Sequence, residues 1–395
     1  MSKLDELIAE LCPDGVEFVT VEEICDITRG RVMSKNYLRE NTGVYPVYSS
    51  QTANNGVFGY INTFDYDCES VTWTTDGANA GSVFYHINEK FSITNVCGLL
   101  RVKNNELVST KFLFYVLQVY AKKYVNDGMG NPKLMSNVMA RISVPLPPLA
   151  VQQEIVRILD NFTELTAELT AELTAELTAR RKQYEYYRDL LLTFGDEVEW
   201  KTLGEIGKLI RGSGLLKSDF VEEGFPCIHY GQIHTYYGTS ATETISFVSV
   251  DKSKKLKKAK KGDVLIAGVS ENVEDVCKPL AWLGGDICIS GDMFAFRHNQ
   301  NTKYITYLLQ TTDFSRYKEK FAHGAKVTRL RQDKLLAYKI PVPPLEEQER
   351  IVAILDRFDA LCNDLTSGIP AEIEARQKQY EYYRDKLLSF KEVTA

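Results

Sequence analysis

The sequence predicts an α/β protein, more closely α+β, that arose as a tandem duplication with pseudo-twofold symmetry. Two globular domains alternate along the chain with two long helical segments, which we expect to pair as an antiparallel coiled coil. Two observations predict this arrangement. A stretch from Leu146 to Phe194 recurs 196 residues later, from Val342 to Phe390. Helical periodicity fills both copies, whereas short β-rich runs broken by turn residues fill the regions between them.

The two copies are alike at both ends and differ in the middle. Their openings, LPPLAVQQEIVRILDNF and VPPLEEQERIVAILDRF, agree at 10 of 17 positions, and their ends agree at 10 of 12 positions from Gln183 and Gln379. Both ends keep one offset, so the unlike spacers have equal length, and a repeat of this size sets the organisation of the chain. We expect a domain at 1–145, a helical region at 146–195, a domain at 196–341 and a helical region at 342–395.

The first domain begins with a short helix over residues 2–11 (SKLDELIAEL), which Pro13 and Gly15 end. From Val16 the sequence alternates β-rich runs such as VYPVYSSQ, VFGYI, ESVTWTTDG and GSVFYHI with Gly, Asn, Asp and Thr. This pattern predicts a compact domain that is α/β or mostly β. The domain closes with a helix over 110–125, which leads into the loop 126–133 (NDGMGNPK).

The first helical segment starts at Pro147 and Pro148, where a missing backbone N–H costs little. Apolar residues then recur at helical spacing and continue through tandem TAEL repeats as a stripe with a strict spacing of four: Leu165, Leu169, Leu173 and Leu177. A helix from Leu149 to Phe194 would be roughly 70 Å long. Such a helix needs a partner for its apolar stripe, and the second copy is the expected partner.

The second domain repeats the frame of the first with extra residues. Residues 197–212 parallel 15–30 at an offset of 182, and the offset later becomes 196, so about 14 residues are inserted between. We expect the lysine-rich run 252–261 to belong to them. Ser367, Gly368 and Pro370 interrupt the second helical copy, which predicts a break there, with Pro370 in the first turn of the next helix.

Composition places the chain among soluble globular proteins. Charged residues make up 25% and hydrophobic residues 44%, and no apolar run reaches the roughly 20 residues of a membrane span. The acidic N-terminus does not resemble a signal peptide, and eight scattered cysteines without a CxxC pair favour free thiols in a reducing cytoplasm. The net charge is −6, with about −3 in residues 1–141, about +4 in 195–340, and about −3 and −4 in the two helical segments.

These features together resemble the specificity subunit of type I restriction–modification systems, over essentially the whole chain. The resemblance rests on the two PPL-x-x-Q-x-x-IV-x-ILD-x-F openings, the two QYEYYRD closings and the TAEL repeats at Thr166–Leu177. The repeats are similar to those of the subgroup whose members differ in TAEL copy number. Because the motifs are duplicated at one offset, they are far more specific together than singly.

The resemblance implies a function without catalysis. The globular domains would be target-recognition domains that each read one half of a split site in double-stranded DNA, and the paired helices would fix the unspecified spacer. Two modification (methyltransferase) subunits would dock on this scaffold, and restriction subunits would join them. No cofactor would bind this chain, since S-adenosylmethionine, ATP and Mg would belong to the partner subunits.

The residues themselves agree that catalytic motifs are missing. The only PP pairs occur in LPPL and VPPL, which lack the Asn or Asp before and the aromatic after that an amino-methyltransferase needs. No GxxxxGK[ST] phosphate loop is present. A self-contained enzyme is therefore disfavoured. The alternative function is a coiled-coil scaffold without DNA readout, which would explain the helices but not two divergent, loop-rich domains.

Several loop residues are candidates for contacting DNA, because Lys and Arg neutralise phosphates, Gly lets the backbone approach closely, and polar side chains bond base edges. In the first domain they are Arg29, Arg31, Lys35, Ser49, Gln51, Asn54, Asn55, Gly128, Gly130, Asn131 and Lys133. In the second they are Arg211, Lys217, His229, Tyr230, Gln232, His234, Gly324, Lys326 and Arg329. The alternative for each is a solvated turn or a local hydrogen bond.

Other features have plainer readings beside functional ones. His229 and His234 have no third ligand nearby, which disfavours a metal site. The lysine-rich run is as consistent with a solvated face as with phosphate steering. The acidic row Glu164, Glu168, Glu172 and Glu176 should face solvent or a basic partner. Six tyrosines of the closings are expected to pack between helices, with a modification-subunit interface as second choice: Tyr184, Tyr186, Tyr187, Tyr380, Tyr382 and Tyr383.

Overall fold

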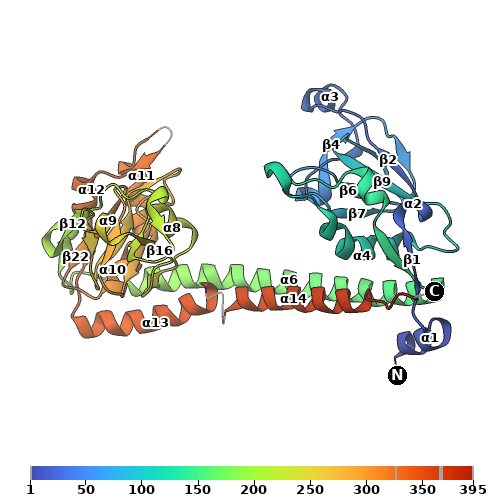
Figure 1. Ribbon diagram of the computed structural model, residues 1–395. Helices are drawn as coiled ribbons and strands as arrows, with labels where there is room; N and C mark the ends of the chain where they lie inside the picture. Colours follow the sequence, from blue (N-terminus) through green and yellow to red (C-terminus); the bar gives the residue numbers. More distant parts are fainter. Residues whose placement is uncertain (1, 325–326, 364–367, 394–395) are drawn as a thin grey trace. The chain divides into compact units, whose positions relative to one another are not determined.

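The computed structural model describes residues 2–324, 327–363 and 368–393 and divides into two compact units. Unit 1 runs from the N-terminus to Leu169 and resumes at Arg376, and unit 2 is Thr170–Ala375. Each unit contains one globular domain and its own part of the long helices (Figure 1). Domain 1 denotes residues 17–146, and domain 2 denotes residues 200–341.

Domain 1 contains two four-stranded sheets and a small third sheet. The first sheet has the order β2-β9-β6-β7, with bounds Cys25–Arg29, Cys97–Val102, Ser70–Thr74 and Val83–His86. The second has the order β4-β3-β8-β5, with bounds Val57–Ile61, Tyr45–Tyr48, Lys90–Ile93 and Tyr66–Asp67. The third pairs β1 (Glu17–Thr20) with β10 (Ser143–Leu146). Strands β3, β4, β6 and β7 fall within the β-rich runs named from the sequence, whereas β1, β2, β5, β8 and β10 lie outside them.

Helix α4 (Thr110–Tyr120) provides the core of domain 1 with the first sheet. Its Phe112 and Leu113 are buried together with Trp73 of β6, and the Ser109 hydroxyl caps its N-terminus. The predicted N-terminal helix is confirmed as α1 (Lys3–Leu11). The shorter helices are α2 (Val21–Ile24), η1 (Ala53–Gly56), α3 (Lys35–Glu40), η2 (Ala121–Tyr124), η3 (Gly128–Gly130) and α5 (Ser136–Ala140).

Domain 2 repeats both sheets and adds an edge strand to each. The first has the order β12-β22-β18-β20-β15: Gly207–Arg211, Met293–His298, Val264–Ala267, Pro279–Trp282 and Ser240–Ala241. The second has the order β13-β16-β14-β21-β17: Phe220–Val221, Ser246–Val248, Phe225–Ile228, Ile287–Ile289 and Lys258–Ala259. Two-stranded sheets pair β11 (Trp200–Thr202) with β24 (Lys339–Pro341) and β19 (Val269–Ser270) with β23 (Thr328–Arg329). The helices are α7 (Leu203–Ile206), η4 (Lys217–Asp219), α8 (Tyr230–Thr235), α9 (Val250–Ser253), α10 (Thr302–Leu308), α11 (Thr312–Phe321) and α12 (Gln332–Leu336).

Strand registers locate the extra residues of domain 2. Tyr48 and Ile228 occupy equivalent places in parallel strand pairs, an offset of 180. Tyr66 and Ala259 are equivalent at an offset of 193, so 13 residues are gained within 229–257, where α8, β15 and α9 lie. The prediction for the lysine-rich run is therefore right only in part, because its last four residues lie in β17 and the turn after it.

The long helices follow the prediction, including the break. Helix α6 runs without interruption over Leu149–Leu191, whereas the second copy is split into α13 (Leu345–Asn363) and α14 (Ile369–Leu387). Gly368 is a bend, and Pro370 lies in the first turn of α14, where it costs no hydrogen bond. Ser367 lies outside the described residues.

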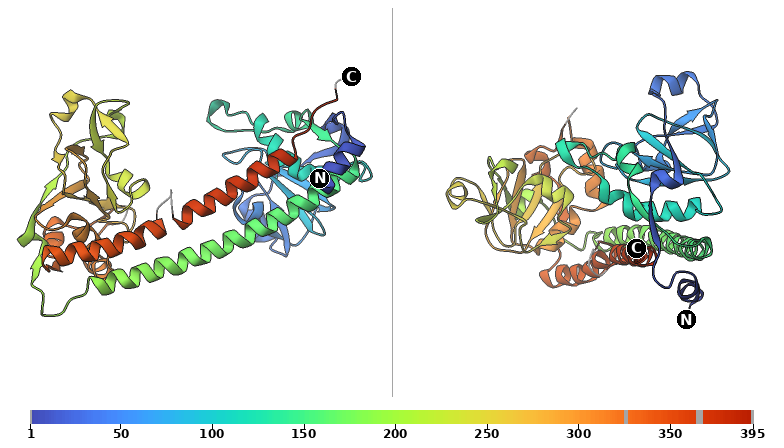
Figure 2. Two further views of the ribbon diagram at one scale, coloured as in Figure 1. Left: turned by 90° about the horizontal axis from the view of Figure 1, so that it is seen from below. Right: turned by 45° about the vertical axis from the view of Figure 1, so that its right-hand side comes forward.

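The helices pair antiparallel within each unit (Figure 2). In unit 1 the first half of α6 packs on α14, where the rings of Phe162 and Tyr383 stack with centroids 6.1 Å apart. In unit 2 the second half packs on α13, where Tyr187 and Phe358 stack at 5.7 Å. The second copy is therefore the partner of the first, as the sequence predicts.

The leucine stripe of the TAEL repeats does not face one way, which corrects the expectation for it. Leu173 is 9% exposed, but Leu165 is 60% exposed, and Leu169 and Leu177 lie between these extremes. The reason is geometric: four residues turn an α-helix by about 400°, so a strict spacing of four winds around it by about 40° per repeat. Among these four leucines, Leu173 is the one that is buried.

The closing tyrosines also divide by position. Tyr184 is buried, and Tyr187 and Tyr383 stack on the partner helix as expected. Tyr186 and Tyr382 are 64% and 63% exposed, so packing between helices is wrong for these two. All eight cysteines are free thiols, as predicted. Within the described ranges, none of the helices is long and apolar enough to cross a membrane.

Candidate nucleic-acid interface

One turn in each domain gathers candidate residues that lie far apart in the sequence. We call it the hub turn: residues 94–96 after β8 in domain 1, and residues 290–292 after β21 in domain 2. Its two copies differ in number by 196, the offset of the helical repeat. The strand that ends in a candidate arginine and the loop after β3 or β14 both bond to it.

Arg29 and Arg211 are the equivalent last residues of β2 and β12. The half-buried Arg29 guanidinium donates to the carbonyl oxygen of Asn95 in the hub turn and, at 3.2 Å, to the Thr75 hydroxyl. The exposed Arg211 donates from Nε to the carbonyl oxygen of Gly291 at 3.1 Å. Among the described residues, the terminal nitrogens of Arg211 have no hydrogen-bond partner, so this arginine has more capacity for a ligand.

A glycine follows each arginine because the chain passes against the strand before the hub turn. A Cβ atom at Gly30 would overlap the carbonyl oxygen of Ile93, and one at Gly212 would overlap that of Ser290. Only glycine permits this approach, so the repeated Arg-Gly pair places the guanidinium at a fixed point.

The two glycine-containing loops close as small β-hairpins. Asn126 and Lys133 exchange backbone hydrogen bonds of 2.9 and 3.0 Å, and His323 and Arg329 exchange bonds of 3.0 and 3.1 Å. Gly130 adopts a positive φ of 74°, which favours glycine at this tip. The first hairpin exposes Gly128, Gly130 and Asn131, and Gly324 lies in the second. Lys326 lies outside the described residues.

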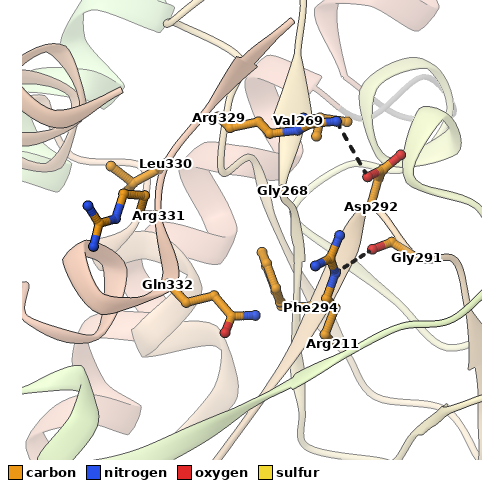
Figure 3. Close-up of a pocket in the computed structure, with 10 residues that line it drawn as sticks. All are labelled: Arg211, Gly268, Val269, Gly291, Asp292, Phe294, Arg329, Leu330, Arg331 and Gln332. Atoms are coloured by element: carbon orange, nitrogen blue, oxygen red, sulfur yellow. Dashed lines mark hydrogen bonds and ion pairs between the residues drawn. The ribbon is translucent and has the colours of Figure 1, made fainter. Parts of the chain in front are cut away.

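In domain 2 the hairpin and the arginine strand line one cleft of about 420 Å³ (Figure 3). Arg211 and Arg329 lie in it together with Arg331, and the carboxylate among the lining residues is Asp292, whose Oδ1 is 4.0 Å from an Arg329 nitrogen. Arg211 and Arg329 present directional donors to this cleft beside Asp292, whereas the Arg331 guanidinium is held by Asp333 through two hydrogen bonds of 3.0 Å. Such donors suit a phosphate or the acceptor edge of guanine.

Domain 1 has Arg29 and Lys133 at the equivalent place. Lys133 is the counterpart of Arg329, and its Nζ lies 3.8 Å from Asp76. Asp76 also pairs with Lys133 through the backbone, as Val269 does with Arg329 in domain 2.

The loops after β3 and β14 meet the hub turn at matching points. Ser49 accepts a hydrogen bond from the Thr94 hydroxyl at 2.8 Å, and the Tyr230 N–H donates to the Ser290 hydroxyl at 2.9 Å. Further along the first loop, the exposed Asn54 and Asn55 have φ values of 50° and 52°. The amide of Gln51 donates to the carbonyl oxygen of Val57.

Gln232 and His229 are engaged inside domain 2. The buried Gln232 amide donates to the Ser246 hydroxyl at 2.7 Å and accepts from the His229 N–H at 2.8 Å. Burial lowers the pKa of His229, and the charge of Lys217 lowers it further, so the ring is neutral at pH 7. His234 bonds the carbonyl oxygen of Val269 at 3.2 Å. Within the described residues no group of three or more His, Cys, Asp or Glu is placed to hold a metal.

The remaining candidates are Arg31 and Lys35 in domain 1 and Lys217 in domain 2. Arg31 is paired through the backbone with Thr94, while its side chain bonds Asp65 at 3.1 Å and the Tyr37 hydroxyl at 3.2 Å. Lys35 starts α3 and Lys217 starts η4, and both are exposed. None of these three lines the cleft of Figure 3.

Sequence reasoning missed Arg331 and Gln332 of the cleft. Their counterparts at the offset of 196 are Met135 and Ser136, and the Ser136 hydroxyl lies 3.5 Å from the Arg29 guanidinium. The signal was present in the sequence, since Arg331 lies two residues after Arg329 and continues the basic hairpin. Without a contact between this segment and β12, nothing tied it to Arg211.

Comparison with known proteins agrees with this architecture. A family model described as "Type I restriction modification DNA specificity domain" matches twice, at residues 13–179 and 195–375. A protein of Mycoplasma pneumoniae named as a type I specificity subunit is 34% identical over 374 residues, covering 94% of this chain and 96% of that protein. The EcoR124I/EcoR124II specificity subunit of Escherichia coli is 39% identical over 292 residues, covering 71% of this chain and 70% of that one.

A solved structure supports the fold. A chain from a study of complex assembly and conformational transition of the type I restriction–modification system aligns with a TM-score of 0.67 at 19% identity. The alignment covers 96% of this chain and 98% of that chain. The chain therefore belongs to the type I restriction–modification specificity subunits. Its role is to give such a system its DNA sequence specificity.

Proposed function

We propose that each domain reads one half of a bipartite DNA target and that the paired helices set the spacer between the halves. The observation that supports this is the repetition of the hub turn, its arginine and its hairpin in two domains whose other loops differ. A retained basic frame suits contacts to the DNA backbone, which fix register, whereas the differing loops suit contacts to bases. Arg29, Lys133, Arg211 and Arg329 would then bind phosphates.

The proposed complex assigns all chemistry to partner subunits. This chain would bind double-stranded DNA and two modification subunits, and restriction subunits would join in the full complex. S-adenosylmethionine, ATP and Mg would serve those partners, and this chain would bind no cofactor. The names of the relatives support a specificity role, and the neighbour of similar fold comes from work on type I complex assembly.

The chain alone should bind DNA weakly and with strong salt dependence. Its net charge is −6, and its basic residues gather in domain 2, so it can neutralise few phosphates by itself. The modification subunits would supply much of the clamp. A mobility-shift titration of the purified chain at physiological salt tests this, and specific nanomolar binding without partners would contradict it.

Exchange of one domain tests the two-halves proposal. Residues 16–141 are replaced by the matching segment of a relative, and the modified sites are read from the methylome of cells that carry the complete system. One half-site should change while the other stays the same, because each domain has its own hub turn and its own helix. If both halves changed together, the domains would not read independently.

Deletion of one TAEL repeat, Thr170–Leu173, tests the spacer. The deletion removes about 6 Å of helix and about 40° of rotation. One base pair of B-DNA advances about 3.4 Å and turns about 35°. Rotation decides, because a misphased domain faces the wrong side of the duplex, whereas a few ångströms are absorbed by bending. The spacer should shorten by one base pair with both half-sites intact, and an unchanged spacer would exclude the ruler.

A further inference from the structure

The repeated helix opening fastens each domain to its own helix through a buried glutamine. In unit 1, Gln152 of α6 is fully buried. Its Nε2 donates to the carbonyl oxygens of Pro147 at 2.7 Å and Leu107 at 2.8 Å, and its Oε1 accepts from the N–H of Ser109 at 2.9 Å. Ser109 caps α4, so one amide ties the start of the long helix to the start of the helix that carries the core of domain 1.

Unit 2 repeats this fastening with different partners. Gln348 of α13 is fully buried, and its Nε2 donates to the Pro343 carbonyl oxygen and the Gln300 side-chain oxygen, both at 2.8 Å. Its Oε1 accepts from the N–H of Asn301 at 3.0 Å, and Asn301 caps α10. The geometry is kept although Ser109 has become Asn301.

An aspartate eight residues further along each long helix makes a second fastening. Asp160 accepts from the Tyr115 hydroxyl at 2.6 Å and from Lys111 Nζ at 2.7 Å, both on α4. In unit 2, the corresponding aspartate accepts from a tyrosine hydroxyl at 2.7 Å and a lysine Nζ at 2.8 Å, both on α10: Asp356, Tyr307 and Lys303. Tyrosine and lysine are retained here while the loops around the hub turns differ.

These two fastenings restrict motions that apolar packing allows. Val151, Ile155 and Leu159 of α6 also bury themselves against domain 1. Apolar contact has little directionality, so it resists separation better than sliding or rotation. Hydrogen bonds are directional, and two sets about 12 Å apart along the helix fix both the roll and the tilt of the domain. A single set of hydrogen bonds would still let the domain rotate about that point.

We propose that Gln152 with Asp160, and Gln348 with Asp356, form two positioning joints that make the protein accept one spacer length. This inference rests on the proposed role of the helices in setting the spacer. The paired helices can fix the spacer length only when each end is held rigidly to the domain that reads DNA. A joint that lets a domain roll by about 35° would bring it into phase with the neighbouring base pair. The joint residues would thus determine specificity without touching DNA.

We call the pair Gln152 and Asp160 joint 1 and the pair Gln348 and Asp356 joint 2. The test removes the bonds of Asp160 in joint 1, in the complete complex. The variant Tyr115→Phe/Asp160→Asn keeps side-chain volume and loses the charge-assisted bonds to α4. Its matched control is Tyr85→Phe/Glu69→Gln, which removes a bond of 2.7 Å between a tyrosine hydroxyl and a carboxylate inside domain 1. The readout is the methylome, scored as the modification of sites whose spacer is one base pair longer or shorter.

The joint variant should raise modification at off-length spacers by about tenfold or more, with unchanged bases in both half-sites. The control should keep a single spacer. Asp160→Glu restores the carboxylate and should recover most of the selectivity. If the joint variant lowers thermal stability but keeps one spacer length, the joint is only structural and the proposal is overturned.

Two further arms keep the result readable. Where the double variant does not assemble, Tyr307→Phe removes one hydroxyl from joint 2 and is read in the same way. Its control is Tyr338→Phe, which removes a bond of 2.9 Å to Asp313 inside domain 2. The TAEL deletion is measured in parallel with intact joints. A spacer that ignores the deletion refutes the ruler, whereas one that follows it while joint variants stay selective refutes the joints alone.

Discussion

The two globular domains are alike in the residues that hold the hub turn and the long helix. They differ in the loops around the hub turn. Both have the hub turn at one offset, the Arg-Gly pair before it and the same two bonds to a long helix. Domain 2 alone has α8, β15 and α9 in residues 229–257, and its cleft contains three arginines. The duplicated domains thus share the residues that hold the hub turn and the long helix. They differ in the loops that are candidates for contacting DNA.

The joints show the same contrast on a finer scale. In unit 1 the Tyr380 hydroxyl lies 3.0 Å from the hydroxyl of Thr163. The position equivalent to Thr163 in unit 2 is Asp359, whose carboxylate accepts from Thr239 at 3.1 Å, a residue of the insertion. Tyr184, the counterpart of Tyr380, has a buried hydroxyl without a hydrogen-bond partner among the described residues. A residue of the insertion in domain 2 therefore bonds α13 at the position where, in unit 1, α6 bonds α14.

The largest expected effect is a difference in stability cost between substitution of Gln152 and substitution of Gln348. Gln152→Leu leaves three backbone groups without their partner, an N–H and two carbonyl oxygens, and should cost about 3 kcal/mol. Gln348→Leu leaves one N–H and one backbone carbonyl and should cost about 2 kcal/mol. Thermal unfolding of both variants, each compared with the unsubstituted chain, measures both. Equal costs near zero would mean that the fastenings are solvated rather than buried.

The second effect is a difference between Arg29 and Arg211 in how much each contributes to stability and to DNA binding. Arg211→Ala should change stability by less than about 0.5 kcal/mol but weaken DNA binding by the complete complex several-fold and lower the salt slope by about 0.9. Arg29→Ala should weaken DNA binding as well, but it should also destabilise domain 1 by about 1–2 kcal/mol, since Arg29 bonds Asn95 and Thr75 within it. Unfolding curves and salt titrations on both variants decide. A large stability loss for Arg211→Ala would reverse the assignment.

The third effect is a pH dependence of stability that arises from Asp359 of α13 in unit 2. Burial raises the pKa of Asp359, so the folded state holds more protons than the unfolded state between the two pKa values. Stability is therefore lost as pH rises through that window. Asp359→Asn keeps the acceptor for Thr239 and Asn363 and should raise Tm by roughly 2–4 °C at pH 8. The gain should shrink as pH falls and vanish below the ordinary pKa of an aspartate, and a gain independent of pH would argue against the carboxylate.

The smallest effect is a change in stability that should differ in sign between the equivalent residues Tyr184 and Tyr380. Tyr184→Phe removes a buried hydroxyl that has no partner and should be neutral or stabilising by up to about 1 kcal/mol. Tyr380→Phe removes a bond to Thr163 and should cost about 0.5–1 kcal/mol. Denaturant titrations on both variants resolve the difference. Two losses of equal size would indicate that Tyr184 is satisfied after all.

Much of the candidate interface was open to sequence reasoning, but its grouping was not. The offsets of 182 and 196 marked Arg29 with Arg211 and the two glycine-containing loops as equivalent pairs. They did not indicate that Gln232 is buried and bonded within domain 2, or that Arg331 joins Arg211 in one cleft. Arg211 and Arg331 lie 120 residues apart and meet only in the folded domain, and the burial of Gln232 depends on the elements packed around it.

The sequence by itself determined the duplication, the uninterrupted first helix and the break at Gly368 and Pro370. These features are local or repeated, so propensity and offset suffice to predict them. Only the tertiary structure decided that Leu173 is buried while Leu165 is exposed, and that a buried glutamine ties each domain to its helix. Both outcomes depend on which face of a helix meets a partner, and a spacing of four on a helix of 3.6 residues per turn does not keep one face.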